Sequence, residues 1–441
     1  MSLKTFLQLV ACATLVVSCN KDNIGVSDDN LLALIAEKSR SGSADYFIMP
    51  ASGDYAALPN QEPTNPITDE KVQLGKLLFF ETGLAQDAKT EESKETFSCA
   101  TCHVPESGFL PGRIQGVADG AIGFGDQGNN RVTLSTYAET DLDAQGIRPL
   151  TVMNVTYMTN TLWSGTFGAN DRNVGTEDVW EGVSEINHTG LAGVEAQNIE
   201  GLHLHRMALT DKVLTEYGYA ARFDEAFPDI AVEDRYSVTT ASFAIAAYLR
   251  TILTSEAPFQ RYLKGDNDAL FETEKRGAIV FFGKGNCISC HNGPSFSSMN
   301  FVSLGTKDLY EAGGLNTSPD DPRNLGRGSL TRNPSDMYRF KVPQLYNLKD
   351  AKVYGHGASF STIMQVLKYK NEGVPQREGT RNLAPEFQPL GLNTAELRAL
   401  RAFIKTGLHD PYLSRYQPRR LPSGNCFPAA DFKSALDLHC W

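Results

Sequence analysis

Residues 99–103 read Cys-Ala-Thr-Cys-His, and residues 287–291 read Cys-Ile-Ser-Cys-His. In each pentad two residues separate the thiols, and a His follows the second thiol directly. This spacing is typical of covalent c-type haem attachment, in which each thiol joins one vinyl group and the His binds the iron. The pentads therefore predict two covalently bound haem c groups and redox chemistry. The expected haem-binding residues are Cys99, Cys102, His103, Cys287, Cys290 and His291, and the two histidines are the expected metal ligands.

Two other uses of a Cys-x-x-Cys pair have to be weighed against haem. The pairs can form a four-cysteine zinc site, or each can be a redox dithiol. A zinc site leaves both adjacent histidines unexplained, and a thioredoxin-like motif is expected once, near a βαβ pattern that this sequence lacks. Haem attachment accounts for all five residues of each pentad.

The composition limits the class of partner. The chain has 441 residues, enough for two or three domains, and a formal net charge of -11. An acidic chain is a poor ligand for nucleic acid or for an anionic membrane surface. The charge suits a small basic partner such as a cytochrome, or it serves solubility alone.

The N-terminus has the features of an export signal. Lys4 precedes an apolar stretch, residues 6–17, that is too short to span a bilayer. The sequence Leu-Val-Val-Ser-Cys that ends at Cys19 resembles a bacterial lipobox. We expect residues 1–18 to be a lipoprotein-type signal peptide, with ordinary cleavage nearby as the alternative. The expected location is the periplasmic side of the bacterial cell envelope, with membrane contact only through a lipid anchor on Cys19.

The remaining sequence predicts a mostly α fold with two cytochrome c-like haem domains and extended loops. Thr68 is the expected N-cap of a helix, and a matching helix begins near Thr273. Both helices contain Gly-x-x-x-Phe-Phe, at residues 75–80 and 277–282, and both precede a pentad. This weak repeat indicates two related units. The expected division is a polar tether at 19–60, an N-terminal domain at 61–265, a C-terminal domain at 266–412 and an extension at 413–441.

The extension contains Cys426 and Cys440, which no haem pentad uses. Two unassigned thiols in an oxidising compartment usually pair. We therefore expect a disulfide between them, with two separate buried thiols as the alternative.

The order of motifs resembles the bacterial dihaem cytochrome c peroxidases, from about residue 63 to about residue 411. This family reduces hydrogen peroxide to water with electrons from a small cytochrome c or a cupredoxin, and a homodimer is compatible with the resemblance. The motifs that carry it are Leu74-Gly75 with Leu78-Phe79-Phe80, residues 97–103, Pro149 to Asn154, Leu162 to Gly165, Cys287 to Gly293, Phe340 to Asn347 and Tyr354 to Gly357.

The resemblance implies different tasks for the two haems. Peroxide would react at the N-terminal haem, bound by His103. Electrons would enter at the C-terminal haem, bound by His291. Trp163 matches a tryptophan between the haems and is a candidate electron bridge, with an ordinary buried aromatic as the alternative.

The sequence departs from the family pattern around the first haem. Many members carry a releasable His ligand in an Ile-Gly-His-Gly segment, whereas this chain has Phe124, which cannot bind iron. The first iron is therefore expected to keep an open position at rest. Gln197 matches the family's distal Gln, but the distal Glu position falls near Met207. His203 or His205 is the expected replacement, because a His can move protons near neutral pH.

The outer ligand of the second haem and a calcium site are also altered. The second ligand of the iron in the second haem is expected to be Lys370 or Tyr369. Adjacent residues of a helix point about 100° apart, so only one of them can reach the iron. Met364 is a weaker option. His356 is expected to form structural hydrogen bonds. Many relatives hold a calcium ion between the domains, but the position of its Asn ligand falls at Arg148, so calcium stays an open expectation.

The sequence thus predicts a cytochrome-c peroxidase. Two other functions use the same parts. One is a dihaem electron-transfer cytochrome with both irons fully ligated. The other is the oxidative modification of a partner protein, as in the relative that matures methylamine dehydrogenase.

Overall fold

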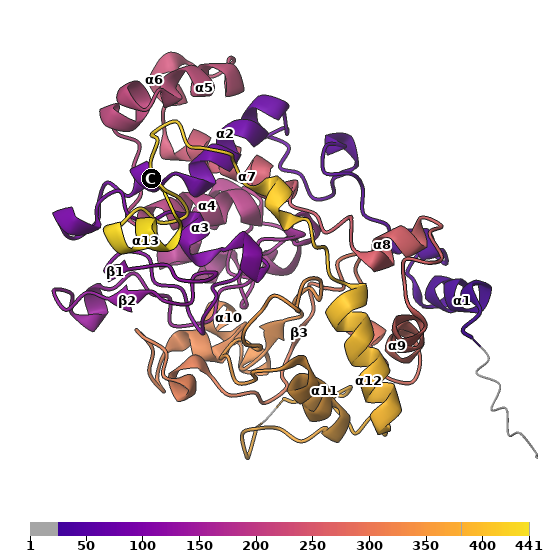
Figure 1. The fold of residues 1–441 in the computed structure, drawn as a ribbon. Coiled ribbons are helices and arrows are strands. Elements are labelled where there is room, and N and C mark those ends of the chain that lie inside the picture. The colour runs from indigo at the N-terminus through magenta and orange to yellow at the C-terminus, as the bar shows by residue number, and fades with distance from the viewer. Residues whose placement is uncertain (1–24, 381, 441) are drawn as a thin grey trace, which may run out of the picture.

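The computed structural model describes residues 25–380 and 382–440, and within them the fold is mostly helical (Figure 1). Two short antiparallel sheets are present, β1 (Ala121–Ile122) with β2 (Val132–Thr133) and β3 (Phe301–Val302) with β4 (Phe340–Lys341). The expected mostly α class is therefore confirmed. Besides the helices described below, the fold has α3 (Cys99–Cys102), α4 (Gly193–Leu204), α5 (Tyr219–Ala226), α6 (Val232–Arg235), α8 (Pro258–Leu263), α10 (Gly328–Thr331) and α11 (Ile363–Glu372).

Two closely packed helix pairs organise the molecule. Helix α2 (Asp69–Phe80), capped by Thr68, packs against α7 (Val238–Arg250), and α9 (Glu272–Phe282) packs against α12 (Thr394–Ala402). A Cβ atom on Gly75 would lie 1.9 Å from the Ala244 carbonyl oxygen, and one on Gly277 would lie 2.1 Å from that of Ala399. Only glycine fits at both crossings. The Gly-x-x-x-Phe-Phe repeat therefore has the same packing role twice.

Each helix pair has its own apolar core. Phe79 and Tyr248 pack together in the first core, with their ring centroids 5.6 Å apart. Phe281, Phe296 and Phe403 pack together in the second. These aromatic side chains fill most of the space behind the two pentads, which follow α2 and α9 in the chain.

Part of the expected tether is folded, which corrects the sequence-based division. Within residues 28–60, helix α1 (Asp28–Lys38) buries Leu31 and Ile35, and Phe47 follows them into the second core. The segment is polar on average, but these side chains gain burial only against α9 and its neighbours. The predicted signal peptide and Cys19 lie outside the described residues.

The C-terminal extension runs back across the first helix pair. The Tyr248 hydroxyl donates to the Tyr416 carbonyl oxygen over 2.9 Å. The expected disulfide between Cys426 and Cys440 is confirmed. Between these cysteines, α13 (Phe432–Asp437) lies beside β1 and near α3 (Figure 1).

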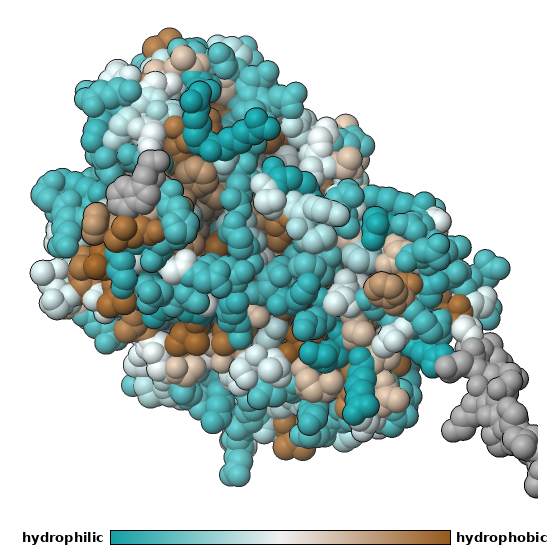
Figure 2. All heavy atoms as spheres, in the orientation of Figure 1, coloured by the Kyte–Doolittle hydropathy of each residue, from teal (hydrophilic) through white to brown (hydrophobic). Residues whose placement is uncertain are grey.

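The described helices include none that is both long and apolar enough to cross a bilayer. Figure 2 shows a mostly hydrophilic face on which apolar residues form small, scattered groups.

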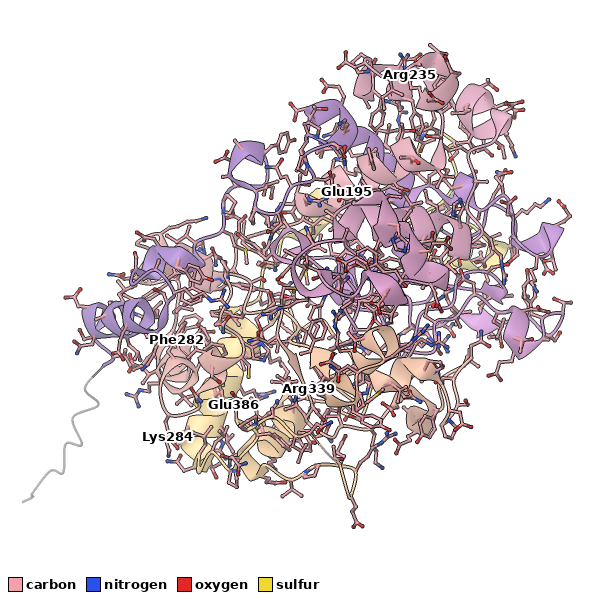
Figure 3. All side chains as sticks on the ribbon, turned by 180° about the vertical axis from the view of Figure 1, so that it is seen from behind. Glu195, Arg235, Phe282, Lys284, Arg339 and Glu386 are labelled. Carbon is pink, nitrogen blue, oxygen red and sulfur yellow. A yellow bond between two sulfur atoms is a disulfide. The ribbon has the colours of Figure 1, made fainter. Side chains whose placement is uncertain are left out.

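A buried ion pair joins α7 to α4, the helix that carries Gln197. Both Nη atoms of Arg250 donate to the Glu195 carboxylate, over 2.6 and 2.7 Å, and both side chains are almost fully buried (Glu195 is labelled in Figure 3). The Asn65 amide also donates to Glu195 over 3.1 Å. Removing one partner would leave an uncompensated buried charge.

We therefore expect Arg250→Met to lower the free energy of unfolding by about 3–5 kcal/mol. Urea unfolding of the haem-loaded protein, followed by circular dichroism, measures the change. Arg261→Met is the matched control, because Arg261 pairs with Asp266 at the surface over 3.7 Å, where such pairs contribute about 1 kcal/mol or less. Equal losses in the two variants would contradict the role given to the buried pair.

Candidate functional site

Each pentad forms a tight turn that presents its two thiols together. Ser98 and Thr101 form a capping box around α3, so Cys99 and Cys102 stand one turn apart on the same side. The second pentad has a 3₁₀ turn over Cys287–Ser289. All four thiols are free of disulfides. They are thus available for two thioether bonds at each site.

The two pentad histidines have the same hydrogen-bond geometry. Nδ1 of His103 lies 3.0 Å from the Phe109 carbonyl oxygen, and Nδ1 of His291 lies 2.7 Å from that of Phe296. A carbonyl oxygen only accepts, so Nδ1 carries the proton and Nε2 keeps a lone pair for a metal. Burial lowers the pKa of each imidazole to about 4, outweighing the hydrogen bond. Both rings are neutral, as an iron ligand must be.

The pentads do not combine into a zinc site. Among residues 25–380 and 382–440, no three His, Cys, Asp or Glu side chains lie close enough together to hold a metal ion. The four-cysteine alternative is therefore excluded for the described residues, and each pentad serves its own site.

The two candidate distal histidines point to different sides of helix α4. His205 lies at its end, and its Nδ1 is 2.8 Å from a carboxylate oxygen of the buried Asp143. Successive helical residues turn by about 100°, so His203 points to another side. The His203 side chain is exposed and has no hydrogen-bond partner among the described residues, whereas the charge of His205 acts on His103. Of the two, His205 is therefore the candidate with an acidic partner and an electrostatic effect on the first pentad.

Asp143 sets the properties of His205. Burial acts to lower the pKa of His205, but the charge of Asp143 and its hydrogen bond outweigh burial, so this pKa lies above its usual value. Gln197 lies eight residues before His205, about 80° from it around the helix axis. A Cβ atom built on Gly201, between them, would meet nothing within 4 Å. This side of α4 therefore borders open space.

Trp163 lies in the seam between the two halves. Its indole N–H donates to the Arg148 carbonyl oxygen over 2.7 Å, and its own carbonyl accepts from the Lys341 backbone over 2.8 Å. Its ring meets that of His356 edge-on at a centroid distance of 6.2 Å. His356 itself is bonded to Asp308 over 2.6 Å. The position suits the expected bridge, and His356 has hydrogen-bond partners on both ring nitrogens.

Two buried cations beside Trp163 lack acidic partners. In the described part of the chain, Nε and Nη2 of Arg148 have no hydrogen-bond partner, and Nζ of Lys341 donates only to the Asn160 carbonyl oxygen. Burial lowers the pKa of Arg148 to about 10 and that of Lys341 to about 7. Buried cations require an anion. The propionate carboxylates of a haem would satisfy both, so these residues fit the cofactor.

The same seam does not fit the calcium ion that many relatives hold. Arg148 falls at the Asn ligand position, and a guanidinium has no lone pair to offer and repels a cation. No step of the chemistry below is therefore assigned to calcium.

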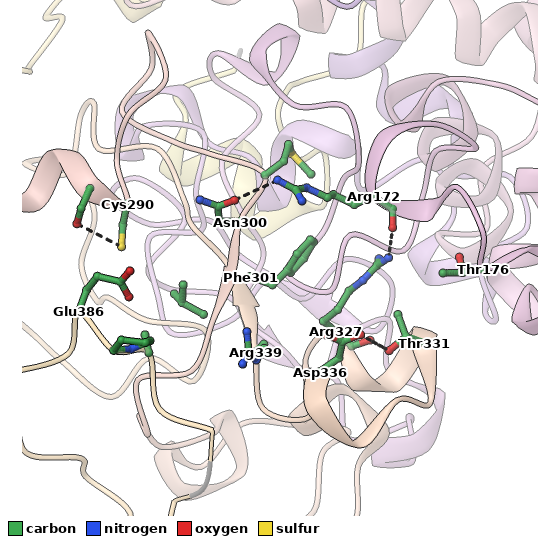
Figure 4. A pocket seen from close by; sticks show the side chains of 15 residues that line it. Arg172, Thr176, Cys290, Asn300, Phe301, Arg327, Thr331, Asp336, Arg339 and Glu386 are labelled. Atoms are coloured by element: carbon green, nitrogen blue, oxygen red, sulfur yellow. Dashed lines mark hydrogen bonds between the residues drawn. The ribbon is translucent and has the colours of Figure 1, made fainter. Parts of the chain in front are cut away.

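The second pentad opens onto a cavity of about 500 Å³. Cys290 lines one end and Arg327 the other, and Arg172 reaches it from the N-terminal half (Figure 4). Arg339 and Glu386 complete its charged lining. A thiol at one end and three guanidinium groups along the wall suit a flat cofactor with carboxylate substituents.

Lys370 and Tyr369, the alternative outer ligands, are placed differently. The Tyr369 hydroxyl donates to the Leu304 carbonyl oxygen, and its ring packs against Phe387 at 5.1 Å. Burial raises the pKa of this phenol to about 12. Within the described residues Lys370 forms no hydrogen bond or ion pair; its Nζ lies 5.6 Å from the centroid of the Phe387 ring, and its charge acts on Cys287 and His291. Burial lowers the pKa of Lys370 to about 8.

Two features of the site were absent from the sequence-based interpretation. Asp143 lies far from His205 in the sequence, and no local pattern marks it. Lys341 belongs to a family-like motif, but its burial without an acid appears only in three dimensions. Met364, the weaker ligand candidate, packs against the second core.

Comparisons with known proteins agree with the motifs. Residues 69–268 match the family model described as di-haem cytochrome c peroxidase. Cytochrome-c peroxidase IdrP1 of Denitromonas iodatirespirans is 27% identical over 361 residues, 77% of this chain and 82% of that protein. Methylamine utilization protein MauG of Methylorubrum extorquens is 28% identical over 383 residues, 84% of this chain and 90% of that protein.

A solved structure supports the fold. The crystal structure of a MauG-like protein associated with microbial copper homeostasis matches with a TM-score of 0.57 and 22% identity, covering 83% of this chain and 95% of that one. Two pentads with matching imidazole geometry, the order of motifs and these similarities agree with one another. Residues 69–268 match the di-haem cytochrome c peroxidase family, and the chain is similar to relatives of that family over most of its length.

Proposed function

We propose that this protein is a peroxidase that reduces hydrogen peroxide to water with electrons from a small redox protein, a cytochrome c or a cupredoxin. The family consists of haem oxidoreductases, which supports the reaction class. The observation that carries the proposal is the pairing of His205 with Asp143 on the side of α4 that faces the first pentad. A proton-transfer group is needed for peroxide cleavage and has no use in simple electron transfer.

The chain's own residues supply binding and proton transfer. The haem, when bound, supplies the iron at which peroxide binds and exchanges electrons. Asp143 accepts a hydrogen bond from Nδ1–H of His205 and thereby fixes the ring, so Nε2 can take a proton from one peroxide oxygen and return it to the other. The Gln197 amide can hold the peroxide by a hydrogen bond.

The second site is organised for electron entry. Lys370 lies near its thiols with no hydrogen bond or ion pair to the described residues, its Nζ 5.6 Å from the centroid of the Phe387 ring, and as a neutral amine it could bind the second iron. A filled position keeps peroxide away from that iron. Trp163 lies in the seam between the halves and is the proposed path for electrons from the second site to the first. The two sites together fit the expected arrangement of two cytochrome c-like domains.

Oxidative modification of a partner protein is the second candidate function. It is favoured by the likeness to the methylamine utilization proteins called MauG, at 28% identity. It would use the same first site with a protein as the source of electrons. A pure electron-transfer role is disfavoured, because Phe124 cannot bind the first iron and the His205–Asp143 pair suits proton transfer.

The location, the membrane anchor and the oligomeric state of the protein stay predictions. Export to the periplasmic side of a bacterial envelope and a lipid anchor on Cys19 are expectations from the sequence, and a homodimer is compatible with the resemblance. They fit a catalyst whose covalent haems are attached outside the cytoplasm.

The central test is the state of the fully oxidised protein with two haems. We expect one high-spin and one low-spin haem by electron paramagnetic resonance, because Lys370 is the proposed ligand at the second site and Phe124 offers none at the first. Hydrogen peroxide should then react in a stopped-flow experiment without prior reduction. A resting protein with two low-spin haems that ignores peroxide would support the electron-transfer role instead.

We expect His205→Gln to lower kcat/KM for hydrogen peroxide by about 10²–10⁴-fold, the usual contribution of an acid–base group. His203→Gln is the matched control, since it lies on the same helix but is exposed, and it should keep nearly full activity. Steady-state assays with a reduced cytochrome c measure both variants. If the two variants lose activity equally, or only His203→Gln does, the assignment of His205 is wrong.

Lys370→Ala should convert the low-spin signal of the second haem into a high-spin signal, because it removes the proposed ligand. Tyr369→Phe is the control and should leave the spectrum unchanged, since the hydroxyl is engaged by the Leu304 carbonyl. Electron paramagnetic resonance and absorption spectra of the oxidised variants report the change. A low-spin signal that survives in Lys370→Ala assigns the ligand to another residue.

A further inference from the structure

The C-terminal segment, residues 426–440, holds a loop that lies beside the first pentad. This loop, residues 122–125, is called the Phe124 loop here. Its Gly123 N–H donates to Oδ1 of Asp431 over 2.9 Å. The N–H groups of Phe124 and Gly125 both donate to Oδ2 of Asp437, over 2.9 and 2.6 Å. Three consecutive backbone donors of the loop are therefore bound by two carboxylates of the C-terminal segment.

The side chain of Phe124 is buried by the same contact. It is 3% exposed and packs in a small apolar cluster with Val104, Ala429 and Leu438. Val104 directly follows His103, and the other two partners belong to the C-terminal segment. The Phe124 side chain thus has its own pocket, which keeps it from turning toward the pentad.

The C-terminal segment also binds the pentad turn itself. The hydroxyls of Ser98 and Thr101 both donate to the Pro428 carbonyl oxygen, over 2.9 and 2.5 Å. The Ala430 N–H donates to the Thr96 carbonyl oxygen over 3.0 Å. One segment therefore fixes two neighbouring parts of the first site, the turn that carries the thiols and the Phe124 loop.

A buried cation links the three parts. Arg131 donates to the Gly123 carbonyl oxygen over 3.1 Å, and its Nη1 lies 3.6 Å from Oδ2 of Asp431. The charge of Arg131 also acts on the Cys102 thiol. Asp431 is thus held by the loop on one side and by Arg131 on the other, close to the haem-attachment turn.

The disulfide stabilises the folded form of the short C-terminal segment. Its only helix, α13, has six residues, too few to be stable alone. The bond between Cys426 and Cys440 closes a loop with a sequence separation of 14 and limits the unfolded alternatives of the segment. Asp431, Asp437 and Ala429 lie within this closed loop.

We propose that the C-terminal segment is a positioning element that fixes the Phe124 loop against the first pentad and keeps side chain 124 away from the first iron. The open position on which the proposed peroxidase function depends would then be maintained by Asp431, Asp437 and the disulfide, in addition to the identity of residue 124. The proposal rests on the proposed function only for the haem at His103, and the movement of the loop can be measured independently of activity.

The first experiment measures the loop directly in the protein with both haems bound. Hydrogen–deuterium exchange of residues 121–126 should be about tenfold to a hundredfold faster in Asp437→Ala, the usual effect of losing hydrogen bonds to a charged group. Leu436→Ala is the matched control, because Leu436 is the adjacent, exposed residue of α13. Cys426→Ser with Cys440→Ser should speed the same amides. Unchanged exchange in both the Asp437 and the double-cysteine variants would overturn the proposal.

The second experiment uses Phe124→His to test whether side chain 124 can reach the first iron. In Phe124→His with an intact C-terminal segment, the first haem should stay high-spin by electron paramagnetic resonance. In Phe124→His combined with Asp437→Ala, the freed loop should deliver the imidazole and give a second low-spin haem. If Phe124→His alone is already fully low-spin, or if the combined variant stays high-spin, the segment does not control the loop. Loss of peroxidase activity without these changes would count against the proposed function only.

Discussion

The hydrogen bond from each pentad imidazole to a backbone carbonyl is the interaction on which the rest of the site depends. It fixes the proton on Nδ1 and leaves Nε2 of His103 and His291 as the metal-binding atom. The carbonyls of Phe109 and Phe296 are themselves held by the two aromatic cores. The close helix crossings at Gly75 and Gly277 bring those cores against the pentads. Packing deep in the molecule therefore determines the orientation of both imidazoles.

The sequence predicts the features that depend on local chemistry. The pentads, the Thr68 cap, the repeated glycine and the disulfide partners can be read from residue types and spacing, and the structure agrees with them. The expected tether was wrong for residues 28–60, because their few apolar side chains acquire partners only when α9 is in place. A polar average composition cannot reveal such a contact.

Spacing also could not decide between neighbouring candidates at the site. His203 and His205 are equally placed in the sequence, and only Asp143, 62 residues away, distinguishes them. Tyr369 and Lys370 are adjacent, and the Leu304 carbonyl, 65 residues from Tyr369, engages one of them. In both cases a single long-range hydrogen bond distinguishes the two candidate residues. Such bonds leave no periodic signal in the chain.

The two halves use one template for opposite purposes. The two pentads have the same imidazole geometry, on a short α-helix in the first and a 3₁₀ turn in the second, so a difference between an open and a closed iron would come from residues outside the pentads. Around the first, the nearest proton-transfer group is tied to Asp143 and residue 124 is buried under the C-terminal segment. Around the second, Lys370 lies over the Phe387 ring and its charge acts on the Cys287 thiol. Arg148 and Lys341, buried beside Trp163 between them, carry positive charge that two sets of propionates would neutralise. The cofactors would thus complete the seam between the halves as well as the sites themselves.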